Sequence, residues 1–175
     1  MDARRENDRT PVKNPTTAER TSERELVVTR TFNAPARIVF EAWTRPELLE
    51  RWWVPKSFGL TLLSCEADAR GGGTYRLVFS HPAAPKPMEF FGRYTEVTPH
   101  SRLVWTNEEG GDAGAVTTVT FEEKGGKTLL VMRDLYPSKA ALDAAIASGS
   151  TSGTGETFEQ LDALLVALGR SVGQS

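Results

Sequence analysis

The stretch FNAPARIVFEAWTRPELLERWWVP, Phe32 to Pro55, predicts two short helices directly behind a first strand. Pro35 stands where a helix can begin, since the first helical turn does not need its missing N–H group. Apolar residues then recur at helical spacing from Ala36 to Thr44. Pro46 ends this helix and opens a second, Glu47 to Trp53, because proline cannot continue a helix that is already formed.

On both sides of these helices the apolar residues alternate, which is typical of strands. ELVVTRTF, Glu25 to Phe32, precedes the helices, and about six further strands follow Phe58. The alternating residues are Leu60 and Leu62; Tyr75, Leu77 and Phe79; Leu103 and Trp105; Val119 and Phe121; and the run Leu129 to Met132. Short turns rich in glycine and proline separate these runs. We therefore expect an antiparallel meander in which each strand pairs with its predecessor.

Two more helices are predicted after the meander. Ser138 can cap the first, which runs to about Ala147. The second, Glu156 to Leu168, carries an apolar stripe made of Phe158, Leu161, Leu164, Leu165 and Leu168. Such a stripe must be buried against a sheet. The order of elements predicts an α+β fold in which a curved antiparallel sheet wraps round a long C-terminal helix.

Length and composition indicate a single globular domain with a polar tail. The chain has 175 residues, of which 39% are hydrophobic and 25% charged, and its net charge is -2. This charge gives no reason to expect nucleic-acid binding or membrane insertion, and the single cysteine excludes an intrachain disulfide, so we expect a cytoplasmic protein. Residues 1–24 are almost free of apolar side chains and are expected to be disordered. We expect the domain at residues 25–170 and a short tail at 171–175.

Several further blocks carry a family resemblance. They are GGTY (72–75), EFFGRYTEVTPHSRLVWT (89–106), TVTFEEKGGKTLLVMR (118–133) and SGSTSGTGETFEQLDALL (148–165). Together with the helical stretch quoted above, they resemble the activator of heat-shock protein 90 ATPase homologue-like family, over about Leu26 to Leu168. That family belongs to the SRPBCC, or START-like, superfamily. The resemblance implies the helix-grip (START-like, Bet v-like) fold and a ligand cavity between the sheet and the C-terminal helix.

The sequence departs from the family pattern in two places. Ser152, Thr154 and Gly155 stand where family members usually carry acids and a methionine. Eukaryotic co-chaperones of this group also have a separate N-terminal domain that engages the chaperone. The polar residues 1–24 cannot replace such a domain.

The implied cavity would take a small hydrophobic molecule such as a lipid, with a few polar groups to orient it. We expect its wall to include Trp53, Phe58, Tyr75, Phe79, Phe90, Tyr94, Trp105, Phe121, Phe158, Leu161 and Leu165, although each of them can equally fill the core. Trp52 and Trp53 point about 100° apart on a helix. One of them is therefore expected to pack inward and the other to close the cavity mouth, with Trp53 preferred for the mouth.

No residues have catalytic or metal-binding spacing, so we predict no catalytic residue, no metal and no cofactor. The two histidines, His81 and His100, lie in turn-like sequence, and Cys65 is expected to be an inert strand residue. A carboxylate that faced an apolar cavity would have a raised pKa and could act as an acid or base. The candidates are Glu66, Asp68, Glu96, Glu122 and Asp134, although a solvated charge on the outer face is the more common role of such residues.

Three functions therefore remain open. Binding or transport of a small hydrophobic molecule, which we favour, requires a continuous apolar cavity. A chaperone-associated or stress-response interaction protein requires an exposed patch and a collapsed interior. A cyclase- or hydrolase-like enzyme requires two polar groups within hydrogen-bond reach inside the pocket. Besides the small molecule, a chaperone or a second copy of the chain is kept as a partner.

Overall fold

The computed structural model describes residues 16–108, 114–147 and 154–174. In the described ranges, eight antiparallel strands form one sheet in the order β1-β2-β8-β7-β6-β5-β4-β3. The strands are β1 (Thr17–Arg20), β2 (Glu25–Phe32), β3 (Thr61–Ala67), β4 (Thr74–Ser80), β5 (Met88–Thr98), β6 (Arg102–Thr106), β7 (Val116–Lys124) and β8 (Lys127–Leu135). The helices are α2 (Ala36–Thr44), α3 (Pro46–Leu49), the 3-10 helix η1 (Lys56–Phe58), α4 (Lys139–Ala147) and α5 (Thr154–Gln174).

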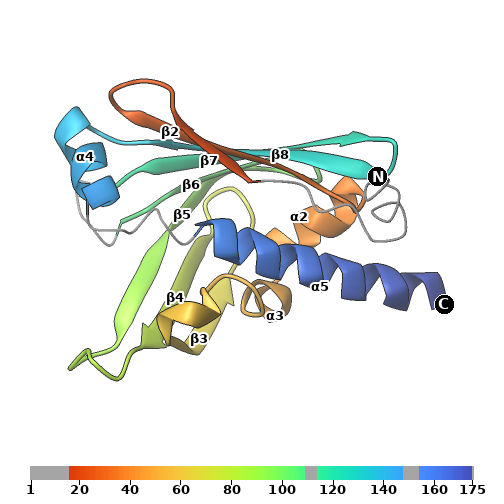
Figure 1. Cartoon of the computed structure of the whole chain (residues 1–175), viewed down its shortest axis with the longest axis horizontal. Coiled ribbons are helices and arrows are strands. Elements are labelled where there is room, and N and C mark those ends of the chain that lie inside the picture. The colour runs from red at the N-terminus through yellow and green to blue at the C-terminus, as the bar shows by residue number, and fades with distance from the viewer. Residues whose placement is uncertain (1–15, 109–113, 148–153, 175) are drawn as a thin grey trace, which may run out of the picture.

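The sheet is strongly curved around α5 (Figure 1). Strands β2, β8, β7 and β6 lie above the helix, while β5, β4 and β3 bend down beside it. From β4 to β8 each strand pairs with its predecessor, β8 also pairs with β2, and β3 is an edge strand. The predicted α+β architecture and the meander are confirmed.

The two helices after β2 form where the prolines allow them. The N–H groups of Ile38 and Val39 both donate to the carbonyl of Pro35, which starts α2. The second helix is shorter than predicted, because α3 ends at Leu49. The chain then continues in turns, in which the N–H of Trp53 still donates to the carbonyl of Leu49 at 3.1 Å.

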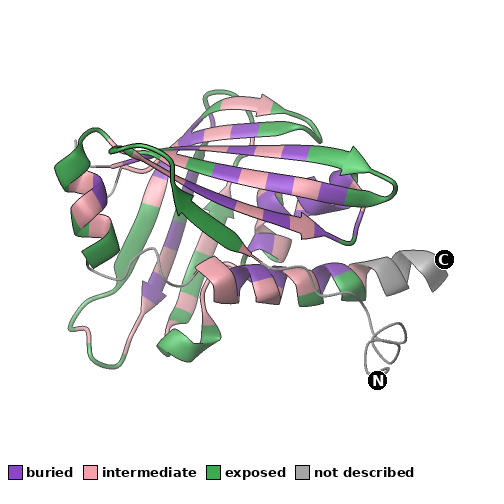
Figure 2. Ribbon diagram, turned by 45° about the horizontal axis from the view of Figure 1, so that its top comes forward, coloured by how far each residue is buried: buried purple, intermediate pink, exposed green. Residues whose placement is uncertain are grey.

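The core lies between the concave face of the sheet and the helices. Buried and exposed residues alternate along the strands, and the buried face of α5 is turned toward the sheet (Figure 2). Phe32 on β2 and Phe158 on α5 meet edge to face with ring centroids 5.6 Å apart. Each is at most 1% exposed, and burying a side chain of this size contributes roughly 1.5–3 kcal/mol.

One charged side chain is buried in this core. Arg30 on β2 is 1% exposed and lies on the same face as Val28 and Phe32. Its guanidinium group lies 3.1 Å from a carboxylate oxygen of Glu159 and 3.4 Å from one of Asp162, both on α5. The charge of Arg30 is thus compensated by two acids from the helix that covers it.

Two predictions about the chain ends are wrong. Thr17–Arg20 does not belong to a disordered tail but forms β1, which pairs with β2 from Thr17↔Thr29 to Arg20↔Leu26. All four side chains are exposed, so backbone hydrogen bonds hold the strand and no apolar pattern marks it. The rest of the predicted tail up to residue 15 lies outside the described residues. At the other end, α5 continues through Gln174 and leaves no separate tail at 171–174.

The helix predicted at Ser138 is present as α4. The hydroxyl oxygen of Ser138 accepts a hydrogen bond from the N–H of Ala141 at 3.0 Å, as expected for a capping residue. None of the helices in the described ranges is long and apolar enough to cross a membrane.

Candidate ligand cavity

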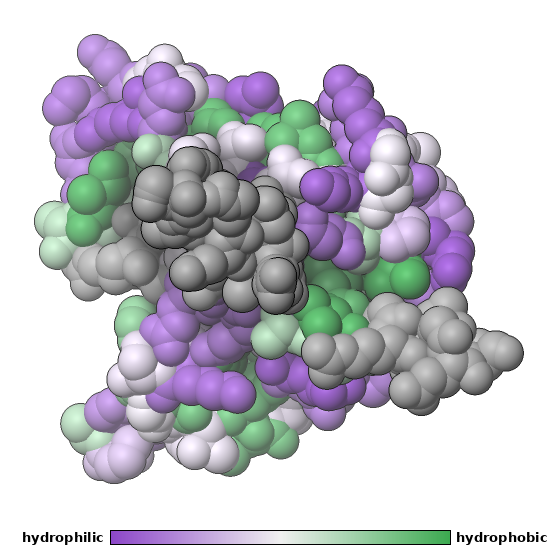
Figure 3. Space-filling model, turned by 45° about the vertical axis from the view of Figure 1, so that its right-hand side comes forward, coloured by the Kyte–Doolittle hydropathy of each residue, from purple (hydrophilic) through white to green (hydrophobic). Residues whose placement is uncertain are grey.

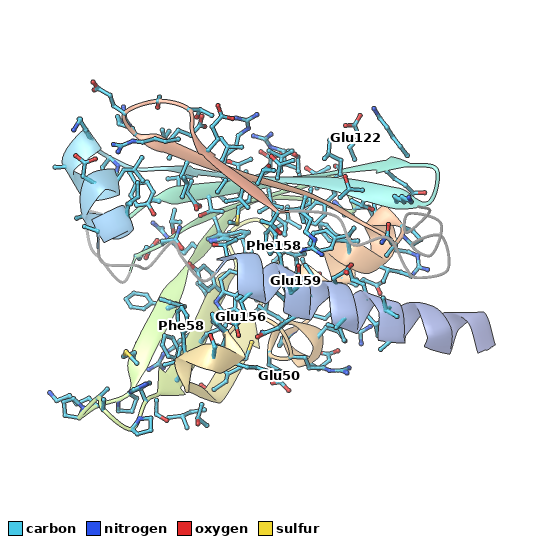
Figure 4. The ribbon with its side chains drawn as sticks, viewed as in Figure 1. Glu50, Phe58, Glu122, Glu156, Phe158 and Glu159 are labelled. Carbon is cyan, nitrogen blue, oxygen red and sulfur yellow. The ribbon has the colours of Figure 1, made fainter. Side chains whose placement is uncertain are left out.

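A cavity of about 310 Å³ lies between the curved sheet and the start of α5. Its wall includes Phe158 from α5 and Phe58 from η1, which Figure 4 shows on opposite sides of the first turn of α5. Nine of the eighteen lining residues are aromatic. The lining residues are Trp43, Trp52, Trp53, Val54, Pro55, Phe58, Leu60, Tyr75, Phe79, Phe90, Trp105, Asn107, Thr117, Met132, Asp134, Thr154, Thr157 and Phe158.

Trp43 on α2 is at the centre of the aromatic wall. Its ring centroid lies 4.8 Å from that of Trp52, 5.9 Å from that of Trp105 and 6.1 Å from that of Phe158. Trp43 is 3% exposed, and its indole N–H has no hydrogen-bond partner among the described residues. The indole N–H of Trp52, in contrast, donates to the carbonyl of Ala42 at 2.9 Å.

A row of polar side chains forms another part of the wall. Trp105 on β6 pairs with Thr117 on β7, and Thr117 pairs with Asp134 on β8, so the three residues lie side by side across the sheet. The hydroxyl of Thr117 donates to Oδ1 of Asp134 at 2.6 Å. The side-chain amide of Asn107 donates to the hydroxyl oxygen of Thr117 at 2.9 Å. Hydrogen bonds thus connect the side chains of Asn107, Thr117 and Asp134 in one row that ends at Asp134.

The two hydrogen bonds that join these side chains are both donated in the direction of Asp134. The Asn107 amide uses its two protons on Thr117 and on the carbonyl of Ala115, and Thr117 uses its single proton on Asp134. Oδ1 of Asp134 is therefore occupied, whereas Oδ2 accepts no hydrogen bond from any residue that the structure describes.

Burial raises the pKa of the Asp134 carboxyl to about 6, and the smaller opposing effect is the hydrogen bond from Thr117. No arginine or lysine contributes to this shift. Asp134 keeps some accessible surface, and because it lines the cavity, its surroundings there are mostly apolar. The carboxyl group of Asp134 thus changes charge close to neutral pH.

Tyr75 connects the polar row to the rest of the wall. Its hydroxyl donates to the carbonyl of Thr106 at 2.7 Å and lies 3.3 Å from the side-chain oxygen of Asn107. Gly92 permits this arrangement, because a Cβ atom there would stand 2.0 Å from the Thr106 carbonyl oxygen and 3.0 Å from the Tyr75 ring. A larger residue at position 92 would push the strands apart at the cavity.

The loop that carries Trp53 and Phe58 is attached to α5 by hydrogen bonds. The side-chain amide of Gln160 donates to the carbonyls of Trp52 and Val54 at 3.0 and 2.9 Å, and its oxygen accepts from the N–H of Lys56. The carboxylate of Glu156 accepts from the N–H and the hydroxyl of Ser57, and these bonds lower its pKa. We call this set of contacts the loop clamp.

The expected wall residues fall into three groups. Seven line the cavity: Trp53, Phe58, Tyr75, Phe79, Phe90, Trp105 and Phe158. Tyr94 lines only a neighbouring pocket of about 20 Å³. Phe121, Leu161 and Leu165 line neither space. They are at most 5% exposed and belong to the core, because their positions on β7 and α5 face other side chains.

Both Trp52 and Trp53 line the cavity. Trp52 is 1% exposed and Trp53 is half-buried, and their ring centroids are 5.4 Å apart. Trp52 packs inward and Trp53 is the more accessible of the two, in line with the expected division, but the turn that follows α3 brings both indoles to the same wall.

Of the five candidate carboxylates only Asp134 lines the cavity. Glu66, Asp68 and Glu122 are exposed, and Glu96 is half-buried and pairs with Arg102 at 3.1 Å. Figure 4 shows Glu122 on the side of the upper strands that faces away from α5. The polar residues Asn107 and Thr117 were not predicted for the wall.

The remaining reactive residues lie outside the cavity. Burial raises the pKa of the Cys65 thiol to about 11, which disfavours its thiolate form. His81 accepts a hydrogen bond from the N–H of Ala83, and the ring of His100 meets that of Phe40 edge to face. In the described ranges no three His, Cys, Asp or Glu side chains are grouped as metal ligands would be.

Comparison with known proteins identifies the family. The family model described as "Activator of Hsp90 ATPase homolog 1-like protein" matches residues 33–166. Among curated proteins, none matches this sequence.

Solved structures of bacterial proteins share the fold. A protein from Rhodobacter sphaeroides is similar with a TM-score of 0.79 and 26% identity, over 87% of this chain and 99% of that one. One from Chromobacterium violaceum has a TM-score of 0.65 and 30% identity, over 81% of this chain and 96% of that one. An AHSA1-like protein from Aeromonas hydrophila is 18% identical over 82% of this chain and 94% of that one, and its TM-score of 0.63 shows the fold alone.

Proposed function

The chain belongs to the family of Activator of Hsp90 ATPase homolog 1-like proteins, and we propose that it binds a small hydrophobic molecule in the cavity beside α5. Membership of the family supports a ligand-binding or chaperone-associated domain in general. The observation that supports ligand binding in particular is the cavity of about 310 Å³, half of whose lining residues are aromatic. Ligand sites typically have volumes of roughly 300–1,000 Å³ and combine an apolar wall with a few polar groups.

Native mass spectrometry of the freshly purified protein tests this proposal. A bound molecule of constant mass is expected, and it should be released when the protein is denatured. Thr157→Phe would fill part of the cavity from α5 and should abolish this extra mass. Ala163→Phe is the matched control, because it adds the same ring at an exposed position of the same helix. A spectrum without bound mass, together with no stabilisation by a panel of hydrophobic compounds, would contradict the proposal.

A second candidate function is catalysis by the cavity carboxylate. The observation that favours it is the pair of Thr117 and Asp134, whose hydroxyl and carboxyl oxygens are 2.6 Å apart in a largely apolar wall. A carboxyl group with a pKa of about 6 suits proton transfer near neutral pH. If a co-purified molecule changes mass during incubation with the wild type and not with Asp134→Asn, the enzyme is supported. An unchanged mass in both would exclude it for that molecule.

Partners and location are part of the same proposal. We favour a cytoplasmic location, supported by the single cysteine of the chain. A chaperone or a second copy of the chain becomes the favoured partner if the cavity proves empty. On the face shown in Figure 3, hydrophobic residues form separate patches between hydrophilic ones. Around the atoms drawn in grey, that distribution gives less support to a large protein-docking surface.

A further inference from the structure

The cavity contains one acidic side chain and no basic one. Asp134 is the only carboxylate among the lining residues, and no lysine, arginine or histidine of the described chain lines the cavity. A ligand that enters it therefore meets a negative or neutral wall, depending on the protonation of Asp134. The wall itself favours a ligand with positive charge.

Asp134 has no cation partner elsewhere in the described part of the chain. The buried cation on the neighbouring strand, Arg30, is already paired with Glu159 and Asp162. Thr117 gives Asp134 one hydrogen bond, to Oδ1; Oδ2 accepts none from the described residues, and Asp134 lines the cavity. The carboxylate thus lacks the compensation that a buried charge ordinarily has.

The aromatic rings supply a second attraction for the same kind of group. Trp105 lies in the same row as Asp134 two strands away, which at the usual strand spacing is roughly 10 Å between backbones. Trp43 contacts the ring of Trp105 and also that of Phe158, and all three rings line the cavity. Faces of aromatic rings attract ammonium groups, because the ring quadrupole places negative charge there.

We propose that the ligand is a hydrophobic amine, whose ammonium group donates a hydrogen bond to Oδ2 of Asp134 while its apolar part lies against the aromatic wall. This inference rests on the ligand-binding function proposed above. A ligand with a carboxylate, such as a fatty acid, would place a second negative charge beside Asp134 and is disfavoured.

Isothermal titration calorimetry at pH 7.5 with three matched probes tests the inference. Phenylbutylamine, phenylbutanol and phenylbutyrate share one apolar skeleton and carry a positive, a neutral and a negative group. We expect the amine to bind at least about tenfold more tightly than the alcohol, and the carboxylate to bind most weakly. In Asp134→Asn the amine should lose this advantage while the alcohol keeps its affinity. Glu122→Gln, an acid-to-amide change at an exposed position, should leave all three affinities unchanged.

The outcomes separate this inference from the proposed function. Equal binding of amine and alcohol, preferred binding of the carboxylate, or an amine preference that survives in Asp134→Asn would overturn the amine assignment and leave ligand binding intact. Absence of binding by all three probes would count against both. Circular dichroism of Asp134→Asn guards against a folding defect, and binding of phenylbutanol by that variant shows that its cavity is preserved.

Discussion

Two neighbouring strands each place a charged residue on the concave face of the sheet, and within the ranges that the structure describes only one of the two has partners of opposite charge. Arg30 on β2 meets Glu159 and Asp162 from α5. Asp134 on β8 receives a single hydrogen bond from Thr117 and otherwise faces the cavity. The buried cation thus has two acidic partners, whereas the half-buried acid has no basic partner among the described residues.

The difference distinguishes a charge that the protein itself compensates from a charge that a bound ligand can compensate. A compensated ion pair holds α5 on the sheet and needs nothing further. An uncompensated carboxyl group costs stability in the empty protein, as its raised pKa indicates. Stability lost at such a site is commonly the sign of a functional role, although ion-pair networks also shift pKa values.

The largest loss of stability is expected when the two acids that compensate the charge of Arg30 are neutralised. Glu159→Gln combined with Asp162→Asn should lower the free energy of unfolding by about 4 kcal/mol, because a buried guanidinium group would remain unpaired. Urea unfolding measures this change. Arg30→Met is the matched control, since it removes the buried charge and keeps most of the volume, and it should cost much less. Equal losses in the two proteins would show that packing and not charge compensation matters here.

Removal of the charge of Asp134 is expected to change the stability in the opposite direction, by raising the free energy of unfolding. The folded pKa of Asp134, about 6, lies above the ordinary value of 3.8, so the folded state binds the proton more tightly. The stability contributed by this group is complete below pH 3.8 and is lost as the pH rises through about 6. Asp134→Asn should therefore stabilise the protein at pH 7.5 by on the order of 2–3 kcal/mol and have little effect at pH 3.5. Thermal unfolding at both pH values, with Glu122→Gln as the exposed control, checks this; a destabilised variant at pH 7.5 would contradict it.

A smaller change in stability is expected when Thr117 is substituted. Thr117→Val removes the hydrogen bond to Asp134 and leaves one Asn107 proton without its acceptor, which should cost about 1 kcal/mol. The same bond lowers the pKa of Asp134, so its loss should raise that pKa further. Carbon-13 NMR titration of the Asp134 carboxyl group measures the shift. Thr117→Ser keeps the hydroxyl and should leave the pKa near its original value.

The sequence predicted the fold because its strong signals are local and repeated. Prolines mark the ends of the helices, glycine-rich turns separate the strands, and the stripe of α5 indicates the element that covers the sheet. The strand β1 was missed because Thr17–Arg20 has no buried side chain. Its pairing depends on the exposed edge of β2, which only the assembled sheet provides.

The polar part of the cavity was only partly predicted, although a usable signal existed. Leu103 and Trp105 face the interior, and the next residue of the same parity is Asn107. In the same way Val119 and Phe121 lead back to Thr117, and Leu130 and Met132 lead on to Asp134. On β8, however, apolar residues occupy both faces from Leu129 to Met132, so parity alone could not assign Asp134 to the inside.

The loop clamp affects the dissociation rate of a ligand and not primarily its equilibrium affinity. Gln160 and Glu156 make five hydrogen bonds to the loop between Trp52 and Ser57, and both side chains are half-buried in the first two turns of α5. If this loop covers the exit of the cavity, the dissociation rate of a molecule inside depends on how often these hydrogen bonds break. The equilibrium affinity depends instead on the aromatic wall and Asp134. Residence time and affinity would therefore be governed by different residues, and natural variation at the clamp could tune one without the other.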